Sequence, residues 1–301
     1  MNRRSFIVSG SSALAAASLP LPSLIAQAPA SKRSIKIAVK YGMVSEGKTV
    51  LEKFKLAKEA GFDGIEPDGP FEESMVQEMI AATKETGLVV PGIVCAKGGR
   101  AMGALDEAAR VEGVETMAKA LRQCKELGGT TVLMYPGVVN KDLPYQAVYD
   151  ALIKSTREVL PVAKETGIKI ALENVWNNIF ISPLDAVRFV DEIGDPHVGW
   201  FLDLGNLARY GWPDHWVKAL GKRTFKLDIK GYSTTKHMKE GPWAGFKVQI
   251  GEDGDEIDWA ATMKALDEVG YEGGWISAEV GGGGLERLKQ IHSQVAKVIA
   301  S

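Results

Sequence analysis

The chain alternates short β-rich runs with longer amphipathic stretches, and the alternation repeats eight times. This pattern is typical of strand–helix units, in which each helix returns the chain so that the next strand pairs in parallel. We expect strands at 35–39, 64–67, 89–95, 131–135, 169–173, 198–203, 224–229 and 275–280. We expect helices near 49–60, 72–86, 105–128, 145–166, 183–193, 214–221, 258–269 and 284–299. Eight such units predict one closed (β/α)8 barrel of the α/β class rather than two domains.

Several expected helices end in similar sequences, namely KEAGFDG, KETGLVV, KELGGTT, KETGIKI and DEVGYEGG. In each of these the glycine can adopt the left-handed conformation that closes a helix. The repeated ending therefore supports the division of the chain into strand–helix units.

The first thirty residues differ from the rest. Arg3 and Arg4 precede an uncharged, alanine-rich stretch at 7–26, which is typical of a cleavable twin-arginine signal peptide. We expect cleavage after Ala30, with Ala28 as the alternative, so that 31–301 forms a single barrel domain. The protein would then be periplasmic or extracellular. A retained membrane anchor is the competing interpretation, but its apolar stretch is borderline in length and is interrupted by Ser, Gly and Pro.

The overall charge excludes one class of partner. The chain has 36 Lys and Arg against 38 Asp and Glu, a formal net charge of −2, and no tract rich in Lys or Arg. It therefore lacks the positive surface that follows a phosphate backbone, and we expect no nucleic-acid partner. The two cysteines provide no disulfide framework. After signal cleavage we expect no stable membrane insertion, and the sequence leaves homo-oligomerisation open.

Four carboxylates stand at the carboxyl ends of expected strands: Glu173, Asp203, Asp228 and Glu279. Alternation along each strand turns all four toward the barrel lumen. The same phase turns four other residues inward, Ala171, Phe201, Lys226 and Ser277, and four outward, Leu172, Leu202, Leu227 and Ala278. One such acid alone would more often form a salt bridge or cap a helix. Four in consecutive strands predict a site that binds a cation and a polyhydroxyl substrate.

Short motifs in the same regions resemble a known family. ALEN, DLGN, KLDIKG and SAEV, with GFDGIE early and IGEDGDEIDW late, are similar to motifs of the xylose isomerase-like TIM-barrel sugar isomerases and epimerases. Relatives in that family include D-tagatose 3-epimerase, hydroxypyruvate isomerase and inosose dehydratase. The resemblance runs from about residue 35 to 299, and the order and spacing of the motifs carry it.

The resemblance implies a metal site. In the family a divalent ion, commonly Mn, Mg or Co, is held by Glu, Asp, His and Glu after strands five to eight. These positions fall on Glu173, Asp203, Asp228 and Glu279, so that an aspartate replaces the family histidine. We expect manganese first, with magnesium or cobalt as alternatives. Three accounts of strand seven stay open: Asp228 is a fourth ligand, it only pairs with a lysine such as Lys226 or Lys230, or His237 supplies the missing imidazole.

The resemblance also implies the chemistry. A ketose or keto-sugar bound through its carbonyl and hydroxyl oxygens would lose a neighbouring proton to form an enediolate. Glu173 and Glu279 take the roles of acid and base, and Asp203 and Asp228 remain ligands. A lyase that eliminates a β-substituent from a keto-sugar or 3-keto-glycoside is the first alternative. A non-catalytic sugar-binding barrel is the second. A DNA-repair endonuclease of the same fold is disfavoured, because it needs more histidines than the four present.

Polar and aromatic residues near the expected strand ends are candidate sugar contacts. They are Glu66, Tyr135, Asn174, Trp176, Asn206, Lys230 and His237. Glu66 could instead cap the next helix, and Trp176 could be loop packing. Trp212 and Trp243, in the loops after strands six and seven, could close over a ligand. The run Gly281–Gly284 is expected to be a flexible loop rather than a phosphate cradle.

Overall fold

The computed structural model describes residues 33–301. The predicted leader at 1–30 lies outside the described residues, so its cleavage, the domain boundary at 31 and export all stay predictions. Within 33–301 no helix is both long and apolar enough to cross a membrane.

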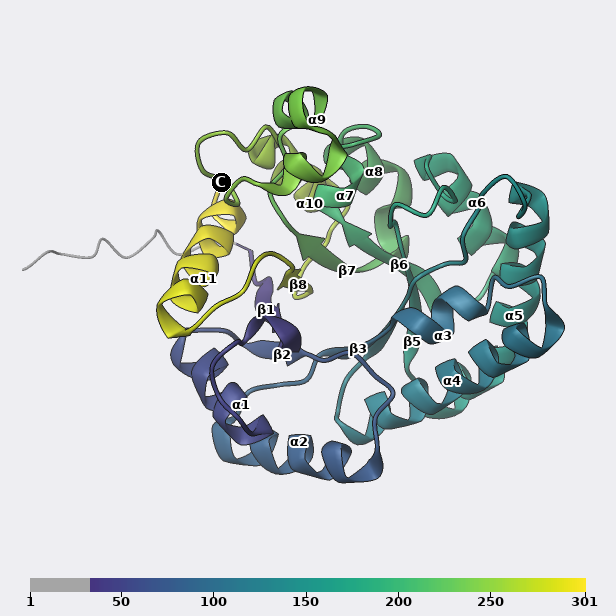
Figure 1. Ribbon diagram of the computed structural model, residues 1–301, viewed down its shortest axis with the longest axis horizontal. Helices are drawn as coiled ribbons and strands as arrows, with labels where there is room; N and C mark the ends of the chain where they lie inside the picture. The colour runs from purple at the N-terminus through teal and green to yellow at the C-terminus, as the bar shows by residue number, and fades with distance from the viewer. Residues whose placement is uncertain (1–32) are drawn as a thin grey trace, which may run out of the picture.

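Eight parallel strands curve around a common axis with helices on the outside (Figure 1). Their order in the sheet is β2-β1-β8-β7-β6-β5-β4-β3. The strands are β1 (Lys36–Lys40), β2 (Gly64–Glu66), β3 (Gly92–Cys95), β4 (Thr131–Met134), β5 (Lys169–Glu173), β6 (Val198–Asp203), β7 (Thr224–Ile229) and β8 (Trp275–Ala278). Between β2 and β3 the ladder is reduced to the bridges Gly64↔Val89 and Asp68↔Val94. The predicted (β/α)8 TIM barrel is confirmed, with a seam at this point.

All eight expected helices are present. They are α1 (Val50–Glu59), α2 (Glu73–Thr86), α4 (Glu107–Glu126), α5 (Tyr145–Thr166), α6 (Pro183–Ile193), α8 (Pro213–Leu220), α10 (Trp259–Glu268) and α11 (Leu285–Ile299). Three short helices that were not expected lie in the segments after strands: α3 (Ala96–Ala101), α7 (Leu204–Leu207) and α9 (Thr234–Glu240). There are also 3-10 turns, η1 (Tyr41–Met43), η2 (Gly221–Arg223) and η3 (Pro242–Phe246).

Helix starts and ends follow the local chemistry of the sequence. Thr49 and Glu52 form a capping box at the start of α1, and Asp258 caps α10 by accepting from Ala261 N. Gly87 and Gly167 are left-handed caps after α2 and α5, with φ of 68° and 72°. The other glycines of the repeated ending also have positive φ: Gly61, Gly128 and Gly270.

The strands separate two apolar layers. A small inner cluster fills part of the lumen, and a much larger outer cluster packs strands against helices. Inner residues are Val94, Leu133, Ala171 and Phe201. Outer residues include Leu172, Leu202, Leu227 and Ala278, so the phase predicted from alternation is confirmed for these four strands. Strands buried on both faces explain why the sequence runs are so uniformly apolar.

Several strands begin or end one or more residues away from their expected bounds. β3 starts at Gly92 rather than at residue 89, because Pro91 has no N–H to give to a ladder. β8 ends at Ala278, so Glu279 lies one residue beyond the strand. Its carboxylate therefore stands at the rim of the barrel rather than inside it.

Candidate active site

Four carboxylates meet at the carboxyl end of the barrel. One oxygen each from Glu173, Asp203, Asp228 and Glu279 lies within 4.8 Å of the others. Glu173 is the last residue of β5, Asp203 is the last residue of β6, and Asp228 is the penultimate residue of β7. All three are buried. The side chain of Glu279 is 32% exposed. We call these four residues the acidic cluster; it opens to solvent on the Glu279 side.

Asp203 is fixed by the chain that follows it. Its Oδ1 accepts hydrogen bonds from the backbone N–H groups of Gly205 (2.9 Å) and Asn206 (2.8 Å), at the start of α7. The side chain of Asn206 then donates to Glu173 Oε1 at 3.3 Å and to the carbonyl of Asn174 at 3.1 Å. The sequence DLGN thus forms a tight turn that orients two members of the acidic cluster.

Two ammonium groups, with little exposure to solvent, face the acidic cluster. Lys230 Nζ lies 2.7 Å from Asp203 Oδ2 and also contacts Glu279 Oε2. Lys40 Nζ lies 2.9 Å from Asp228 Oδ2 and 2.6 Å from Glu66 Oε2. Lysines offset part of the negative charge, because uncompensated carboxylates are costly to bury.

Burial, repulsion between carboxylates and attraction to lysines shift the pKa values of the acids in different directions. Burial raises the pKa of Glu173 well above its usual value, and the charges of Glu279 and Asp228 raise it further. Burial likewise raises the pKa of Asp228, against the opposing effect of Lys40. Burial alone would also raise the pKa of Glu279, but Lys230 and Lys40 lower it below its usual value. The two glutamates therefore differ in proton affinity.

The donor set suits a hard divalent cation. Glu173 Oε2 and Asp228 Oδ1 are buried and have no hydrogen-bond donor within the described residues. Oxygen atoms that lack donors while facing other carboxylates are what an oxygen-seeking cation such as Mn²⁺ or Mg²⁺ would satisfy. The residues that would hold such an ion are the four of the acidic cluster.

Asp228 has the lysine partner that one account of strand seven anticipated, but the partner is Lys40. Lys226, expected as a neighbour of Asp228, instead lies 3.5 Å from Glu66 Oε1 and donates to the carbonyl of Pro91 at 2.5 Å. His237 lies on α9, where its Nδ1 is 2.9 Å from the hydroxyl of Tyr232. The acidic cluster as found contains no histidine among residues 33–301.

The predicted substrate contacts fall into two groups. Asn206 and Lys230 touch the acidic cluster directly. Tyr135 packs against the inner apolar cluster, and its pKa is raised by burial and by the charges of Glu173 and Glu279. These three side chains reach the space around the carboxylates.

The other predicted contacts have protein partners. Asn174 donates to the carbonyl of Asp203 at 2.8 Å and accepts from Trp200 Nε1 and Asp203 N. Glu66 is fully buried between its two lysines. Trp176 donates to the carbonyl of Asn206 at 3.0 Å and stacks on Phe246, with ring centroids 4.9 Å apart. Substrate contact by these residues and by His237 stays a prediction.

Lys40 was not among the site residues predicted from the sequence. It is the last residue of β1 and pairs in register with Glu66 of β2. Alternation from Ala38, which pairs with the inward Ser277, places Lys40 in the lumen. A lysine at the end of a strand in the lumen phase was the signal that could have identified it.

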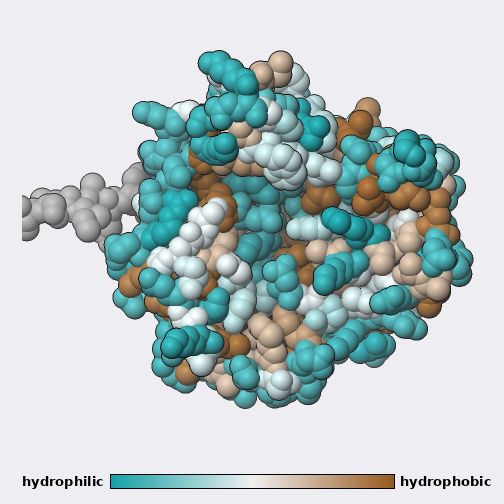
Figure 2. All heavy atoms as spheres, viewed as in Figure 1, coloured by the Kyte–Doolittle hydropathy of each residue, from teal (hydrophilic) through white to brown (hydrophobic). Residues whose placement is uncertain are grey.

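A hollow lies at the centre of the face seen in Figure 2, with hydrophilic residues at its bottom. Beside the acidic cluster a cavity of about 550 Å³ extends outward. We call it the rim cavity. Its lining comprises Asn206, Lys230, Trp243, Phe246, Lys247, Val248, Gln249, Glu279, Val280, Gly281 and Arg287.

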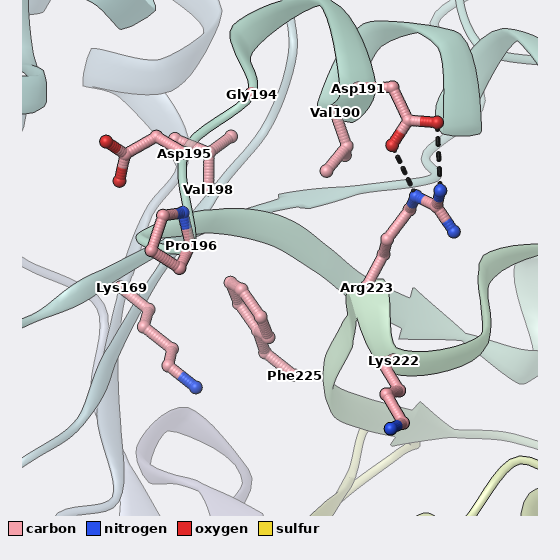
Figure 3. A pocket seen from close by; sticks show the side chains of 10 residues that line it. All are labelled: Lys169, Val190, Asp191, Gly194, Asp195, Pro196, Val198, Lys222, Arg223 and Phe225. Atoms are coloured by element: carbon pink, nitrogen blue, oxygen red, sulfur yellow. Dashed lines mark hydrogen bonds and ion pairs between the residues drawn. The ribbon is translucent and has the colours of Figure 1, made fainter.

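A second pocket lies at the opposite end of the barrel, where β5, β6 and β7 begin. Figure 3 shows Lys169, Phe225 and Lys222 along it, and the guanidinium of Arg223 paired with Asp191 at 2.7 Å. Lys169 Nζ sits 4.3 Å from the centroid of the Phe225 ring. The amino-terminal face of such barrels serves stability, whereas chemistry occurs at the carboxyl ends of the strands. The acidic cluster is therefore the candidate active site.

Comparison with known proteins agrees with this architecture. The family model described as "Xylose isomerase-like TIM barrel" matches residues 54–299. The chain belongs to the xylose isomerase-like TIM barrel family. The resemblance inferred from the motifs is thus confirmed.

Individual relatives are sugar epimerases. The chain is 32% identical over 161 residues to 3-dehydro-D-guloside 4-epimerase of Escherichia coli K12, a match that covers 50% of this chain and 61% of that protein. The E. coli 3-keto-D-glucoside 4-epimerase structure aligns with a TM-score of 0.71 at 21% identity, over 88% of this chain and 98% of that one. The first relative is matched over less than two thirds of its own length, and the E. coli structure, at 21% identity, shows a shared fold.

A further solved relative carries a metal. The IOLI protein, crystallised with a bound zinc atom, aligns with a TM-score of 0.73 at 19% identity, covering 88% of this chain and 98% of that one. At this identity the likeness shows the fold alone.

Proposed function

We propose that the protein is a divalent-metal-dependent epimerase of a ketose or keto-sugar, which moves a proton at the carbon beside the carbonyl. The observation that carries the proposal is the convergence of four carboxylate oxygens within 4.8 Å at the catalytic end of the barrel. The epimerase names of the relatives support it. The acidic cluster would hold Mn²⁺, Mg²⁺ or Co²⁺.

The bound cation would supply a Lewis acid that polarises the substrate carbonyl and stabilises the enediolate charge. Glu173 and Glu279 approach the same point from β5 and from the end of β8. One carboxylate can therefore take a proton from the sugar carbon while the other returns one, which inverts that carbon if they act on opposite faces. Asp203 is fixed by the α7 turn and remains a ligand.

Neighbouring side chains position the acid–base pair. Asn206 donates to Glu173 Oε1, and Lys230 contacts Glu279 and lies 3.4 Å from Asn206 Oδ1. Lys230 can also donate to a substrate hydroxyl or carbonyl oxygen, because an ammonium has three donors. Tyr135, with a raised pKa, stays protonated at neutral pH and can donate as well.

The experiment is proton exchange in deuterated water with Mn²⁺ and candidate keto-sugars. Epimerisation gives inverted product labelled at one carbon, whereas elimination releases the β-substituent. Glu173→Gln and Glu279→Gln should each abolish labelling while the circular dichroism spectrum stays unchanged. Full labelling by both variants would refute the assigned roles, and loss of the substituent would identify a lyase instead.

A further inference from the structure

The acidic cluster can be reached from one side. Glu173, Asp203 and Asp228 are nearly inaccessible, with relative exposures of 1%, 0% and 0%, while the Glu279 side chain is 32% exposed. Glu279 also lines the rim cavity. A sugar carbon placed beside Glu279 therefore leaves the rest of the substrate pointing into that cavity.

The outer wall of the rim cavity is aromatic. Trp243 is 72% exposed, yet its ring lies 4.8 Å from that of Trp176 and 6.2 Å from that of Phe246. Arg209 covers Trp176, with its guanidinium 4.7 Å from the ring. An exposed indole supported by two other rings offers a flat face to a sugar ring or an aromatic group.

The segment that carries this wall is held rigidly. The N–H of Ser233 donates to the carbonyl of Gly245 at 2.9 Å, and the Tyr232 hydroxyl donates to the carbonyl of Pro242 at 3.2 Å. Asp255 accepts from Tyr232 N and from Trp259 Nε1, which ties the base of the loop to α10. A wall fixed before binding loses little conformational freedom when a ligand stacks on it.

Polar residues in the lining of the rim cavity are also held by hydrogen bonds. Arg287 donates to Gln249 Oε1 at 2.6 Å and to the carbonyl of Gly281 at 3.2 Å. The cavity volume of about 550 Å³ falls within the roughly 300–1,000 Å³ of pockets that hold drug-sized ligands. It therefore has room for a ring in addition to the sugar at the acidic cluster.

A phosphate is disfavoured at the usual place. In (β/α)8 barrels phosphate often binds the last loops and a helix amino terminus. Here Leu285 N, at the start of α11, donates to Glu46 Oε2 at 3.1 Å. The carboxylate of Glu46 lies against Gly284, so a negative charge already occupies this position. A second anion there would be repelled.

We propose that the rim cavity is a subsite for the group attached to the sugar, so that the substrate is a keto-glycoside with a second ring rather than a sugar phosphate. The inference rests on the proposed function for the sugar itself. Trp243 is the specificity-determining residue, because its exposed face stacks on that ring.

The test compares methyl and phenyl 3-keto-β-D-glucosides in the Mn²⁺-loaded full chain. Wild-type kcat/KM for solvent exchange should be at least tenfold higher for the phenyl compound, mainly through KM. Trp243→Ala should remove most of that preference. Trp212→Ala is the matched control, because Trp212 is similarly exposed (66%) and lines a different pocket. An equal phenyl preference in Trp243→Ala and wild type would overturn the subsite.

A second variant and a second measurement keep the two proposals apart. Val248→Trp, which narrows the rim cavity, should reduce activity on the phenyl compound more than on the methyl compound. Calorimetry should show the phenyl compound binding wild type more tightly than Trp243→Ala, and equal binding would also overturn the subsite. If the protein catalyses solvent exchange with neither glucoside and with no free ketose, the proposed function is refuted. Calorimetry would still decide whether the subsite exists. Exchange of D-fructose 6-phosphate at least tenfold faster than D-fructose would overturn the exclusion of phosphate.

Discussion

Lys40 Nζ lies 2.9 Å from Asp228 Oδ2, so a buried ammonium from the first strand faces a carboxylate from the seventh. The charges of Asp228 and Glu66 raise the pKa of Lys40 well above its usual value despite its burial. The pair explains how an aspartate can occupy the strand-seven position of the acidic cluster without leaving an additional uncompensated charge.

Lys40→Met should lower the free energy of unfolding of the metal-free protein by about 3 kcal/mol, because it leaves buried carboxylates without their partner. Adding Asp228→Asn should recover part of this loss. Urea denaturation of wild type, the two single variants and the double variant forms a double-mutant cycle that measures the coupling between the two residues. Lys55→Met is the control: Lys55 and Glu85 form an exposed pair at 2.6 Å, with an expected effect below about 1 kcal/mol. Additive effects would show that Lys40 and Asp228 do not depend on each other.

Lys230→Met should tighten Mn²⁺ binding by about tenfold, because the ammonium at Asp203 and Glu279 repels an incoming cation. Free Mn²⁺ measured by electron paramagnetic resonance gives the dissociation constant without reference to turnover. Lys247→Met makes the same change in net charge at an exposed side chain that pairs with Glu240 at 3.7 Å. Weaker binding by the Lys230 variant would mean that the lysine helps to assemble the site.

Asn174→Ala should destabilise the protein by about 2–3 kcal/mol, because Trp200 Nε1 and Asp203 N lose their buried acceptor. The amide also holds Asp203 through its carbonyl, so metal affinity should fall in parallel. Gln77→Ala, on the exposed face of α2, should change stability by less than about 0.5 kcal/mol. A stable Asn174 variant with weak sugar binding would instead favour the predicted substrate contact.

The two thiols should be unreactive in the folded protein. Cys95 and Cys124 are free and buried, and burial raises the pKa of each to about 11. At pH 8 a chromogenic disulfide reagent should titrate neither quickly in native protein and both in denaturant. Rapid reaction of one thiol without denaturant would show local opening around β3 or α4.

Asp195 should make stability depend on pH in acid. Burial alone would raise its pKa, but hydrogen bonds from Lys164 and His197 lower it to about 2. Its contribution is therefore complete above its unfolded pKa of about 4 and disappears as the pH falls toward 2. Asp195→Asn should flatten the stability profile in that window by up to about 1 kcal/mol, since Lys164 is half exposed. Parallel profiles for variant and wild type would contradict this.

Much of the fold could be predicted because hydrophobic alternation and helix caps are local signals. β5, β6 and β7 have the predicted bounds, and strand phase alone predicted that the four acids converge, although Glu279 lies at the rim of the barrel. The short helices α3, α7 and α9 escaped prediction, since segments of four to seven residues carry no periodic pattern.

The partners within the site were harder to predict because they come from distant strands. Lys40 and Asp228 are far apart in sequence, and Lys226 turned toward Glu66 rather than Asp228. Strand phase predicts which residues face the lumen, but not which of them form ion pairs with each other. The pairing depends on the stagger between strands, which is a property of the closed barrel.

Below the acidic cluster, Lys226 joins Glu66 of β2 to the carbonyl of Pro91, just before β3. These contacts span the place where the two strands share few backbone bonds. An ion pair in the interior thus fastens the edge-to-edge junction of the cylinder. Attempts to re-engineer the lumen for other chemistry should keep Lys226 and Glu66. Without this pair the junction between β2 and β3 would be weakened, and the barrel would be destabilised.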